Sequence, residues 1–240
     1  MLNQIEEIRK ILDQSIDSSS ERSAVYFKTG PGEYAEHEQF IGITVPVLRK
    51  IAKKFLAVSL DELKILLSSK FNEERLLALF ILTKNYQIAT KAEKTHLYQF
   101  YCENLKFVNN WNLVDASAHL IIGAELLNGD KNYLFELAAS PSIWQRRIAI
   151  VATWHFIRTH HLDTTFVLAK ALLNDQHDLI HKAVGWMLRE AGKKDQAILK
   201  DFLNIYKEQM PTTMLRYAIE KFSPDERKFY LRTSKIFNNK

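Results

Sequence analysis

The sequence predicts an all-α protein, and three observations support this fold class. Apolar residues recur with the 3.6-residue period of amphipathic helices along most of the 240 residues. Glycine and proline are scarce, at 7 and 5 residues, whereas folds rich in strands and tight turns need many of both. Apolar residues make up 47% of the chain, which is enough to form a sizeable core.

Apolar periodicity and capping residues divide the chain into fourteen expected helices. Ser59 and Glu62 form a capping-box pattern ahead of one helix, and Asn72 precedes two glutamates at the start of the next. The segment Ser223-Pro224-Asp225-Glu226 has the pattern that opens a last helix. The helices are expected at about residues 2–16, 20–28, 44–57, 60–69, 72–88, 91–105, 110–127, 131–139, 142–160, 163–174, 177–192, 195–207, 212–222 and 224–236.

Taken in pairs, these helices form units of about 35–40 residues, the size of HEAT-like repeats. The sequence therefore predicts a HEAT-like solenoid of about six or seven helix pairs, although a compact helical bundle is an alternative. The longest connection is the Gly-Pro-Gly segment from Gly30 to about Ile43. Because no Ser- or Gly-rich linker divides the chain, we expect one domain over residues 1–240, with a tail from about residue 237 that is disordered.

Composition also narrows the setting in which the protein works. Cys102 is the only cysteine, so no internal disulfide is possible and a reducing cytoplasm is expected. The N-terminal residues alternate charged and apolar side chains, unlike a secretion signal. The longest apolar run, 76–82, is far shorter than a membrane span. We expect a soluble cytoplasmic monomer with no membrane contact and no obligate protein partner.

Positive charge is concentrated in the second half of the chain. Residues 1–120 carry 15 Lys and Arg against 15 Asp and Glu, whereas residues 121–240 carry 18 against 13, which accounts for the whole net charge of +5. A basic half suggests an acidic partner such as nucleic acid, although net charge alone is a weak indicator.

The expected helix 177–192 has a distinctive polar face. One side carries apolar residues, and the opposite side carries Lys182, Trp186, Arg189 and Lys193 within a narrow stripe. A tryptophan among three cations, pointing away from the core, is unusual for a structural residue. The structural alternative is that Trp186 packs on a neighbouring helix and the cations are solvated.

Two further segments carry similar residues. Trp111 and Asp115, four residues apart, share one side of the helix expected at 110–127; alone, this pair would be read as a packing residue and a surface acid. Arg147 lies in a helix that is apolar almost all round, so its buried charge needs an acceptor. That acceptor is a structural carboxylate, a phosphate or Asp115. Trp111, Arg147 and Trp186 are separated by 36 and 39 residues, about one repeat each, which places them on one face of a solenoid.

The chain resembles the AlkD-like family of bacterial DNA alkylation repair glycosylases along nearly its whole length. The resemblance rests on the order and spacing of four motifs: Phe40-Ile41-Gly42-Ile43-Thr44-Val45-Pro46, Trp111-Asn112-Leu113-Val114-Asp115, Gln145-Arg146-Arg147-Ile148-Ala149-Ile150, and Lys182-Ala183-Val184-Gly185-Trp186-Met187-Leu188-Arg189-Glu190. It implies a HEAT-like solenoid whose basic concave face cradles duplex DNA. It also implies excision of cationic N3- or N7-alkylated purines with no metal and no other cofactor.

The resemblance carries roles to matching residues. Trp111 and Trp186 correspond to the two indoles that wall the family's cleft, Asp115 to its catalytic carboxylate and Arg147 to the partner of that carboxylate. Candidate DNA-binding residues follow from the same motifs: Lys182, Arg189, Lys193 and Arg146. Family members without the aspartate are not catalytic, so the presence of Asp115 favours activity. The segment from Tyr34 to Ile41 matches only loosely, and its residues stay unassigned.

Two other function classes remain open. A non-catalytic HEAT-like scaffold that binds DNA or protein would also have a basic face, but it has no need of an acid between two indoles. A metal-dependent hydrolase is suggested by His177 and His181, which have the i, i+4 spacing of a helical metal pair. These histidines lack the glutamate of a zinc-protease motif and an obvious third ligand, and the GxSxG motif of serine hydrolases is absent.

Overall fold

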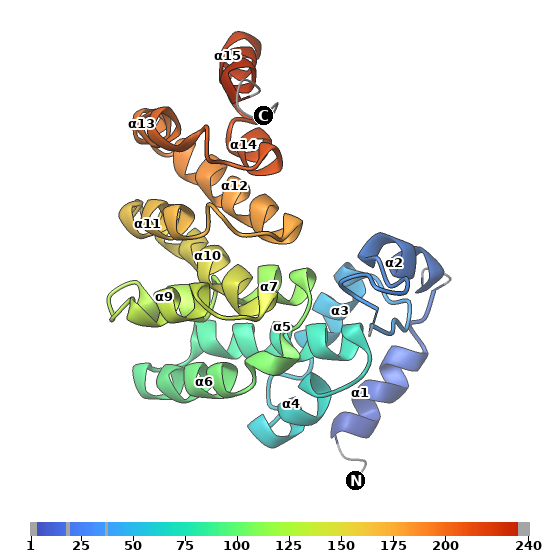
Figure 1. Cartoon of the computed structure of the whole chain (residues 1–240). Coiled ribbons are helices and arrows are strands. Elements are labelled where there is room, and N and C mark those ends of the chain that lie inside the picture. The colour runs from blue at the N-terminus through green and yellow to red at the C-terminus, as the bar shows by residue number, and fades with distance from the viewer. Residues whose placement is uncertain (1–3, 18–19, 37, 235–240) are drawn as a thin grey trace. The chain divides into compact units, whose positions relative to one another are not determined.

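The computed structural model of the chain describes residues 4–17, 20–36 and 38–234. Within these ranges the chain folds into fifteen α-helices and one short 3-10 helix, without a β-strand, which confirms the predicted all-α class (Figure 1). The expected disordered tail lies outside the described residues, as do the outer ends of the first and last expected helices. None of the described helices combines the length and hydropathy of a bilayer-spanning segment.

The chain divides into two compact units, residues 1–117 (unit 1) and 118–240 (unit 2). The prediction of a single domain stays a prediction. Each unit has its own buried apolar residues and its own helix packing.

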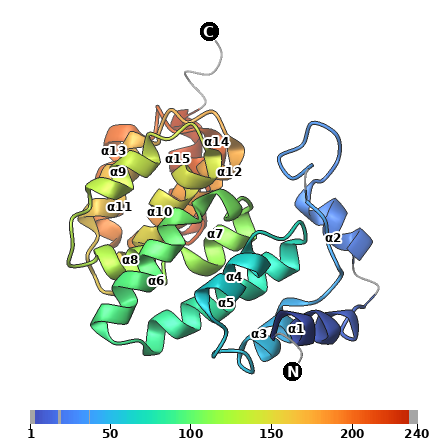
Figure 2. The same cartoon turned by 90° about the horizontal axis from the view of Figure 1, so that it is seen from below.

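Unit 1 is organised around one long helix. Its elements are α1 (Gln4–Asp13), α2 (Ser20–Phe27), α3 (Val45–Ala52), α4 (Leu60–Leu67), α5 (Asn72–Ile88), α6 (Lys91–Glu103), η1 (Leu105–Phe107) and α7 (Trp111–Ser117). Helix α5 is buried along most of its length and packs against α3, α4, α6 and α7 (Figure 2). The predicted capping box of Ser59 and Glu62 is present at α4, and Thr90 and Glu93 form a second one at α6. These caps explain why α4 and α6 begin where they do.

Two acidic residues at the start of α5 are buried and paired. Glu73 accepts backbone N–H groups from Ile41 (3.0 Å) and Gly42 (2.9 Å), and Glu74 accepts two hydrogen bonds from Arg9. Gly42 has φ +97°, a conformation that favours glycine. Because a buried carboxylate needs donors, this arrangement ties the 41–43 segment and α1 to α5.

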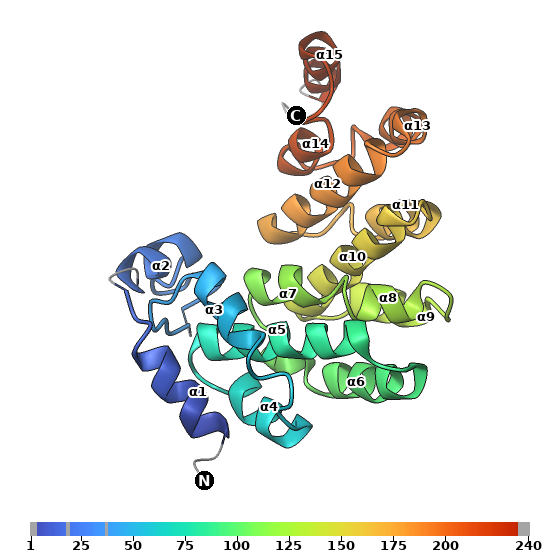
Figure 3. The same cartoon turned by 180° about the vertical axis from the view of Figure 1, so that it is seen from behind.

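Unit 2 has the two-row arrangement of a helical-repeat fold. Its helices are α8 (Ile122–Leu126), α9 (Asn132–Ala138), α10 (Ile143–Arg158), α11 (Asp163–Ala171), α12 (Asp178–Gly192), α13 (Gln196–Tyr206), α14 (Thr212–Ala218) and α15 (Pro224–Ser234). In one row α10 packs on α12 and α12 on α14, and in the other α9 packs on α11 (Figure 3). Consecutive pairs therefore repeat one packing pattern, as predicted for HEAT-like units.

A close approach between two neighbouring helices of one row, α12 and α14, depends on Gly185 of α12. A Cβ atom at this position would lie 2.5 Å from the carbonyl oxygen of Met214 and 2.5 Å from Cβ of Tyr217. Any side chain here would push α12 and α14 apart. Gly185 directly precedes Trp186, so this packing also fixes the backbone position of Trp186.

One expected helix is interrupted. The sequence predicts a continuous helix over 110–127, but α7 ends at Ser117, residues 118–121 form a turn and α8 begins at Ile122. In the turn the N–H of Gly123 bonds the carbonyl of Ala118, five residues earlier. Gly123 itself lies against Ala152 of α10 with no room for a side chain. The packing of α8 on α10 thus interrupts the helix. Apolar periodicity along the sequence cannot predict such an effect of tertiary packing.

Candidate active-site and nucleic-acid-binding residues

Trp111 and Asp115 lie on one side of α7 in unit 1. Both are partly exposed, whereas Leu113, Val114 and Ser117 on the same helix are buried. Helix α7 packs on α5 through this buried side. As the sequence predicts, the indole and the carboxylate thus share the side of the helix that faces away from α5.

A buried polar network holds the start of α7. The N–H of Trp111 bonds Oδ1 of Asn110 (2.7 Å), and Nδ2 of Asn110 donates to Oε1 of Glu38 (3.0 Å). The other oxygen of Glu38 accepts from Arg75 (2.5 Å). Asn110, Glu38 and Arg75 are all at most 6% exposed. The hydrogen bonds that join Arg75, Glu38, Asn110 and the N–H of Trp111 fix the position from which the Trp111 side chain extends.

A second polar contact restrains the same helix. The side-chain amides of Asn72 and Asn112 bond each other, with Nδ2 of Asn112 donating to Oδ1 of Asn72 at 2.7 Å. Near the other end, Oγ of Ser117 donates to the carbonyl of Leu113 and lies 2.8 Å from the Tyr101 hydroxyl. A helix of seven residues is thereby held at both ends.

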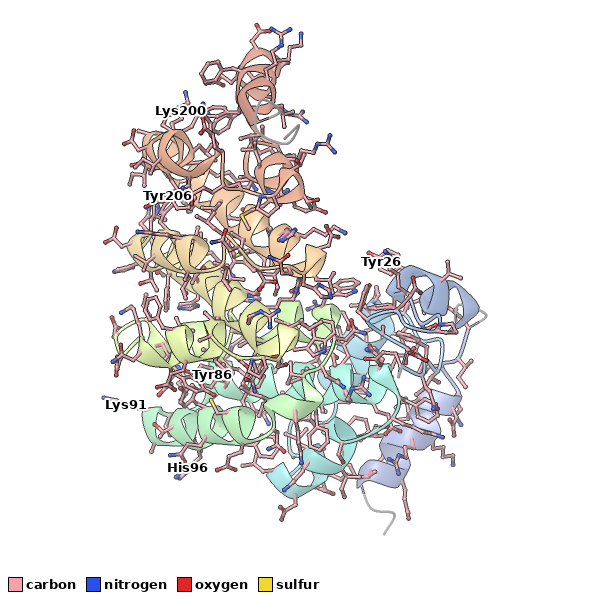
Figure 4. The ribbon with its side chains drawn as sticks, in the orientation of Figure 1. Tyr26, Tyr86, Lys91, His96, Lys200 and Tyr206 are labelled. Atoms are coloured by element: carbon pink, nitrogen blue, oxygen red, sulfur yellow. The ribbon has the colours of Figure 1, made fainter. Side chains whose placement is uncertain are left out.

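Trp111 belongs to an aromatic cluster that the sequence analysis did not identify. Its indole stacks on the Phe27 ring at 4.9 Å with an interplanar angle of 15°, and Tyr26 meets it edge-on at 5.7 Å. Phe27 also contacts Phe40 at 4.8 Å. Tyr26, on α2, is 68% exposed (Figure 4). The adjacent aromatics Tyr26-Phe27 near an expected helix end were the only sequence signal for this cluster.

Arg147 lies on α10 in unit 2 and is buried, with 5% exposure. Its Nη1 donates to the carbonyl oxygen of Leu179 at 2.6 Å, in the first turn of α12. The sequence correctly predicts that this buried cation has an acceptor, and one acceptor is a main-chain carbonyl. Arg147 therefore links neighbouring helices of one row. Its contact with a phosphate or with Asp115 stays a prediction.

Trp186 on α12 packs against a third indole. The rings of Trp154 and Trp186 are 5.0 Å apart at 61°, and the His119 ring lies 4.5 Å from that of Trp154. Both indoles are only partly buried. Trp154 therefore supports Trp186 from α10. Its position among the buried residues of α10 gave no sign of this role in the sequence.

The three cations beside Trp186 each pair with a carboxylate. Lys182 bonds Asp178 at 2.6 Å, Lys193 bonds Glu190 at 2.8 Å, and Arg189 contacts both Glu190 and Glu220. Burial raises the pKa of Asp178, but the hydrogen bond and charge of Lys182 outweigh this effect, so that the pKa of Asp178 is lowered. The lysine side chains of these pairs are exposed, so their ion pairs are weak and can exchange for another anion, whereas Arg189 and Glu190 are only 18% and 16% exposed.

Arg146 occupies a more constrained position than the other predicted DNA contacts. Its Nε bonds Asp175 at 2.6 Å, and its Nη1 donates to the carbonyl oxygens of Ser140 (3.0 Å) and Pro141 (2.9 Å). The Asp175 side chain is 4% exposed. Arg146 thus braces the turns before α10 and α12, and its predicted contact with DNA stays a prediction.

His177 and His181 have structural roles at the start of α12. Nδ1 of His177 accepts the N–H of Leu179 as an N-cap (3.1 Å), and Nε2 of His181 lies 2.5 Å from the Asp175 carbonyl oxygen. Burial lowers the pKa of His177. In the described ranges, no group of three or more His, Cys, Asp and Glu side chains is arranged to hold a metal ion. This pair of histidines is accounted for by the helix start.

The candidate residues thus fall into two sets. Unit 1 holds Trp111 and Asp115 on α7. Unit 2 holds Arg147 on α10, with Trp186 and the cations on α12. The prediction that both sets line a single DNA-binding surface stays a prediction.

Comparison with known proteins agrees with the features of both units. The sequence profile of a family described as "DNA alkylation repair enzyme" matches residues 8–222. No curated protein matches. Among solved structures, a chain described as "Predicted DNA alkylation repair enzyme from Enterococcus faecalis" matches with a TM-score of 0.63 and 17% sequence identity, over 86% of this chain and 95% of that one. At this identity the structural match establishes the fold. The profile spans most of the chain and includes all four motifs. This protein therefore belongs to the DNA alkylation repair enzyme family.

Proposed function

We propose that the protein is a DNA glycosylase that hydrolyses the N-glycosidic bond of cationic N3- or N7-alkylated purines in duplex DNA. The observation that carries this proposal is the pairing of Trp111 with Asp115 on α7. Both side chains are partly exposed on a short helix, and buried hydrogen bonds hold that helix in place. Membership of a DNA alkylation repair family supplies the type of substrate.

The chemistry suits a lone carboxylate. Alkylation at N3 or N7 gives the purine a positive charge, so the base departs neutral when its bond to the sugar breaks, and no general acid is required. Positive charge then develops on the sugar. A carboxylate at Asp115 would stabilise this oxocarbenium-like transition state and would orient or deprotonate the attacking water.

Indole rings suit the same substrate. The face of an indole attracts cations, with a contribution of roughly 0.5–2 kcal/mol for each contact. Trp111 and Trp186 would contact the cationic lesion or the developing sugar cation. A neutral base gains no such attraction, so the indoles would favour alkylated over normal purines.

The cations of unit 2 are proposed to hold the DNA backbone. Lys182, Arg189 and Lys193 lie beside Trp186 on α12, and each would exchange its carboxylate partner for a phosphate. Arg147 would support Asp115 and a phosphate near the lesion. Arg146 stays a candidate DNA contact, in addition to bracing turns within unit 2.

Asp115→Asn tests the catalytic assignment. The amide keeps the size of the side chain but removes its negative charge, so we expect the rate of base release to fall about 10²- to 10³-fold with DNA binding retained. The measurement is release of 7-methylguanine and 3-methyladenine from methylated duplex DNA, followed by chromatography under single-turnover conditions.

Asp61→Asn is the matched control, because Asp61 is an exposed acid on α4 of the same unit. It should release base at the wild-type rate. If Asp115→Asn also retains the wild-type rate, Asp115 is not catalytic. A protein that binds duplex DNA but releases no base in its wild-type form would instead be a non-catalytic scaffold.

A further inference from the structure

A cavity in unit 2 lies beyond the end of α10 that is far from Arg147, and one of its lining residues, Lys194, directly follows Lys193. It has a volume of about 530 Å³ and is bounded by the segments that precede α9, α11 and α13. Four of its side chains can donate hydrogen bonds to an anion: Lys131, His160, His161 and Lys194. His160 lies just beyond the C-terminal end of α10 and follows Arg147 by thirteen residues. At the rise of an α-helix, roughly 20 Å separate these two residues.

The two lysines of this cavity are not paired with acids. Asp163 and Asp195 also line it, yet within the described part of the chain neither lysine forms an ion pair with them. Lys131 donates only to the carbonyl of Leu127 (3.2 Å). This arrangement contrasts with α12, where Lys182, Arg189 and Lys193 all have carboxylate partners. The two ammonium groups are therefore available to an incoming anion.

The two carboxylates of the cavity are partly compensated elsewhere. Oδ1 of Asp195 accepts the N–H groups of Ala197 (2.9 Å) and Ile198 (3.1 Å) at the start of α13. Asp163 is the first residue of α11. Carboxylates at helix N-termini are stabilised by the positive end of the helix dipole, which offsets their charge. They therefore oppose an anion in the cavity less than two free carboxylates would.

His160 adopts a backbone conformation that normally belongs to glycine. It has φ +63° at the end of α10. Its N–H bonds Ile157 (3.1 Å) and the N–H of His161 bonds Phe156 (2.9 Å), the pattern of a Schellman cap. Glycine would adopt this cap without strain. An imidazole here brings an N–H donor to the cavity whether it is neutral or protonated.

We propose that this cavity binds a phosphate group through Lys131, Lys194, His160 and His161. Ammonium and imidazole donors converging from separate segments give charge-assisted hydrogen bonds to phosphate oxygens. The hydroxyl of Thr164, which also lines the cavity, adds a neutral donor. The phosphate could belong to a DNA strand or to a small free phosphate compound. This site does not depend on the proposed glycosylase activity.

Binding of inorganic phosphate to the full chain tests the proposal. The ring resonances of His160 and His161 are followed by NMR during a phosphate titration at constant ionic strength. We expect saturable shifts, with binding weakened at least about five-fold in Lys194→Gln. Lys170→Gln is the matched control, since Lys170 is an exposed lysine of α11 outside the cavity lining, and it should bind phosphate within two-fold of wild type.

His160→Gly separates binding from folding. The melting temperature of the glycine variant should equal that of wild type or exceed it by up to about 3 °C, because glycine adopts the left-handed conformation without strain. The variant should nevertheless bind phosphate more weakly than wild type, because it lacks the imidazole donor. Absence of shifts at about 50 mM phosphate, or equal binding by wild type and Lys194→Gln, would overturn the proposal.

Undamaged duplex DNA identifies the source of the phosphate. If it is a DNA backbone phosphate, Lys194→Gln should lower duplex affinity and reduce the salt dependence of log K by about one, relative to Lys170→Gln. If it belongs to a small compound, duplex affinity should match the control while inorganic phosphate still binds more weakly.

Discussion

At the scale of single residues, the two faces of the Trp111 indole are not equivalent. Phe27 stacks on one face at 4.9 Å, so a base in the proposed reaction would have to meet the opposite face. Phe27→Leu keeps an apolar side chain but removes the flat support, so Trp111 gains rotational freedom. We expect single-turnover base release to slow about 3- to 10-fold, because a mobile indole is poorly oriented toward the lesion.

Val25→Ala is the control for this substitution. Val25 lies on the same helix, α2, and is 82% exposed. Both variants should melt within a few degrees of wild type, because neither side chain belongs to the fully buried core. Equal rates of base release in Phe27→Leu and Val25→Ala would show that the stacking does not position Trp111.

Residue identities in the site were predictable from the sequence to different degrees. The i, i+4 spacing of Trp111 and Asp115 placed them on one side of a helix, and the apolar surroundings of Arg147 predicted a buried cation with an acceptor. Partners that depend on distant segments were not predictable. Phe27 reaches Trp111 from 84 positions away, and no periodicity within one helix encodes such a contact.

At the scale of helices, the start of α12 depends on an uncharged histidine. Nδ1 of His177 accepts the N–H of Leu179, and burial lowers the pKa of this imidazole. The folded state therefore binds the proton less readily than the unfolded chain, whose histidines titrate near pH 6.5. The stabilisation is complete above about pH 6.5 and is lost as the pH falls through the lower pKa of the folded state.

His177→Asn tests this dependence, because asparagine caps a helix without titrating between pH 5 and 8. From pH 7.5 to pH 5, the melting temperature should fall less in His177→Asn than in wild type. His155, whose pKa is also lowered by burial, is present in both proteins and cancels in the comparison. Parallel pH profiles would exclude a contribution from the His177 cap.

Helix positions followed from sequence where local signals were strong. The expected helix at 72–88 coincides with α5, and the caps predicted at Ser59 and Ser223 are both present. The cap predicted at Asn72 is wrong, because Phe71 is the N-cap of α5 and the Asn72 side chain bonds Asn112 instead. The interruption between Ser117 and Ile122 was missed, because it arises from the close packing of Gly123 on α10. The buried charges at the start of α5 were also missed, since their partners come from α1 and the 41–43 segment.

At the scale of the whole molecule, positive charge is unequally divided. Residues 1–117 have equal numbers of basic and acidic residues, and residues 118–240 carry the entire excess of +5. Yet the cations expected to meet DNA on α12 are compensated by Asp178, Glu190 and Glu220. The effective charge presented to a phosphodiester chain is therefore smaller than the sequence count suggests, and the acids of α12 should tune DNA affinity.

Glu190→Gln tests that effect, because Glu190 contacts both Arg189 and Lys193. Its loss frees Lys193 and leaves Arg189 with Glu220 as its carboxylate partner. We therefore expect affinity for undamaged duplex DNA to rise about 3- to 10-fold at low salt, with a salt dependence of log K steeper by about one. Glu136→Gln on α9 changes the net charge equally but removes an exposed acid from the other helix row. If both variants gain affinity to the same extent, net charge alone governs binding. We expect a larger gain in affinity in Glu190→Gln than in Glu136→Gln. This result would mean that a carboxylate of the protein competes with DNA for the same cations. The affinity for normal duplex DNA would then be limited by the protein's own acids and not by a shortage of basic residues.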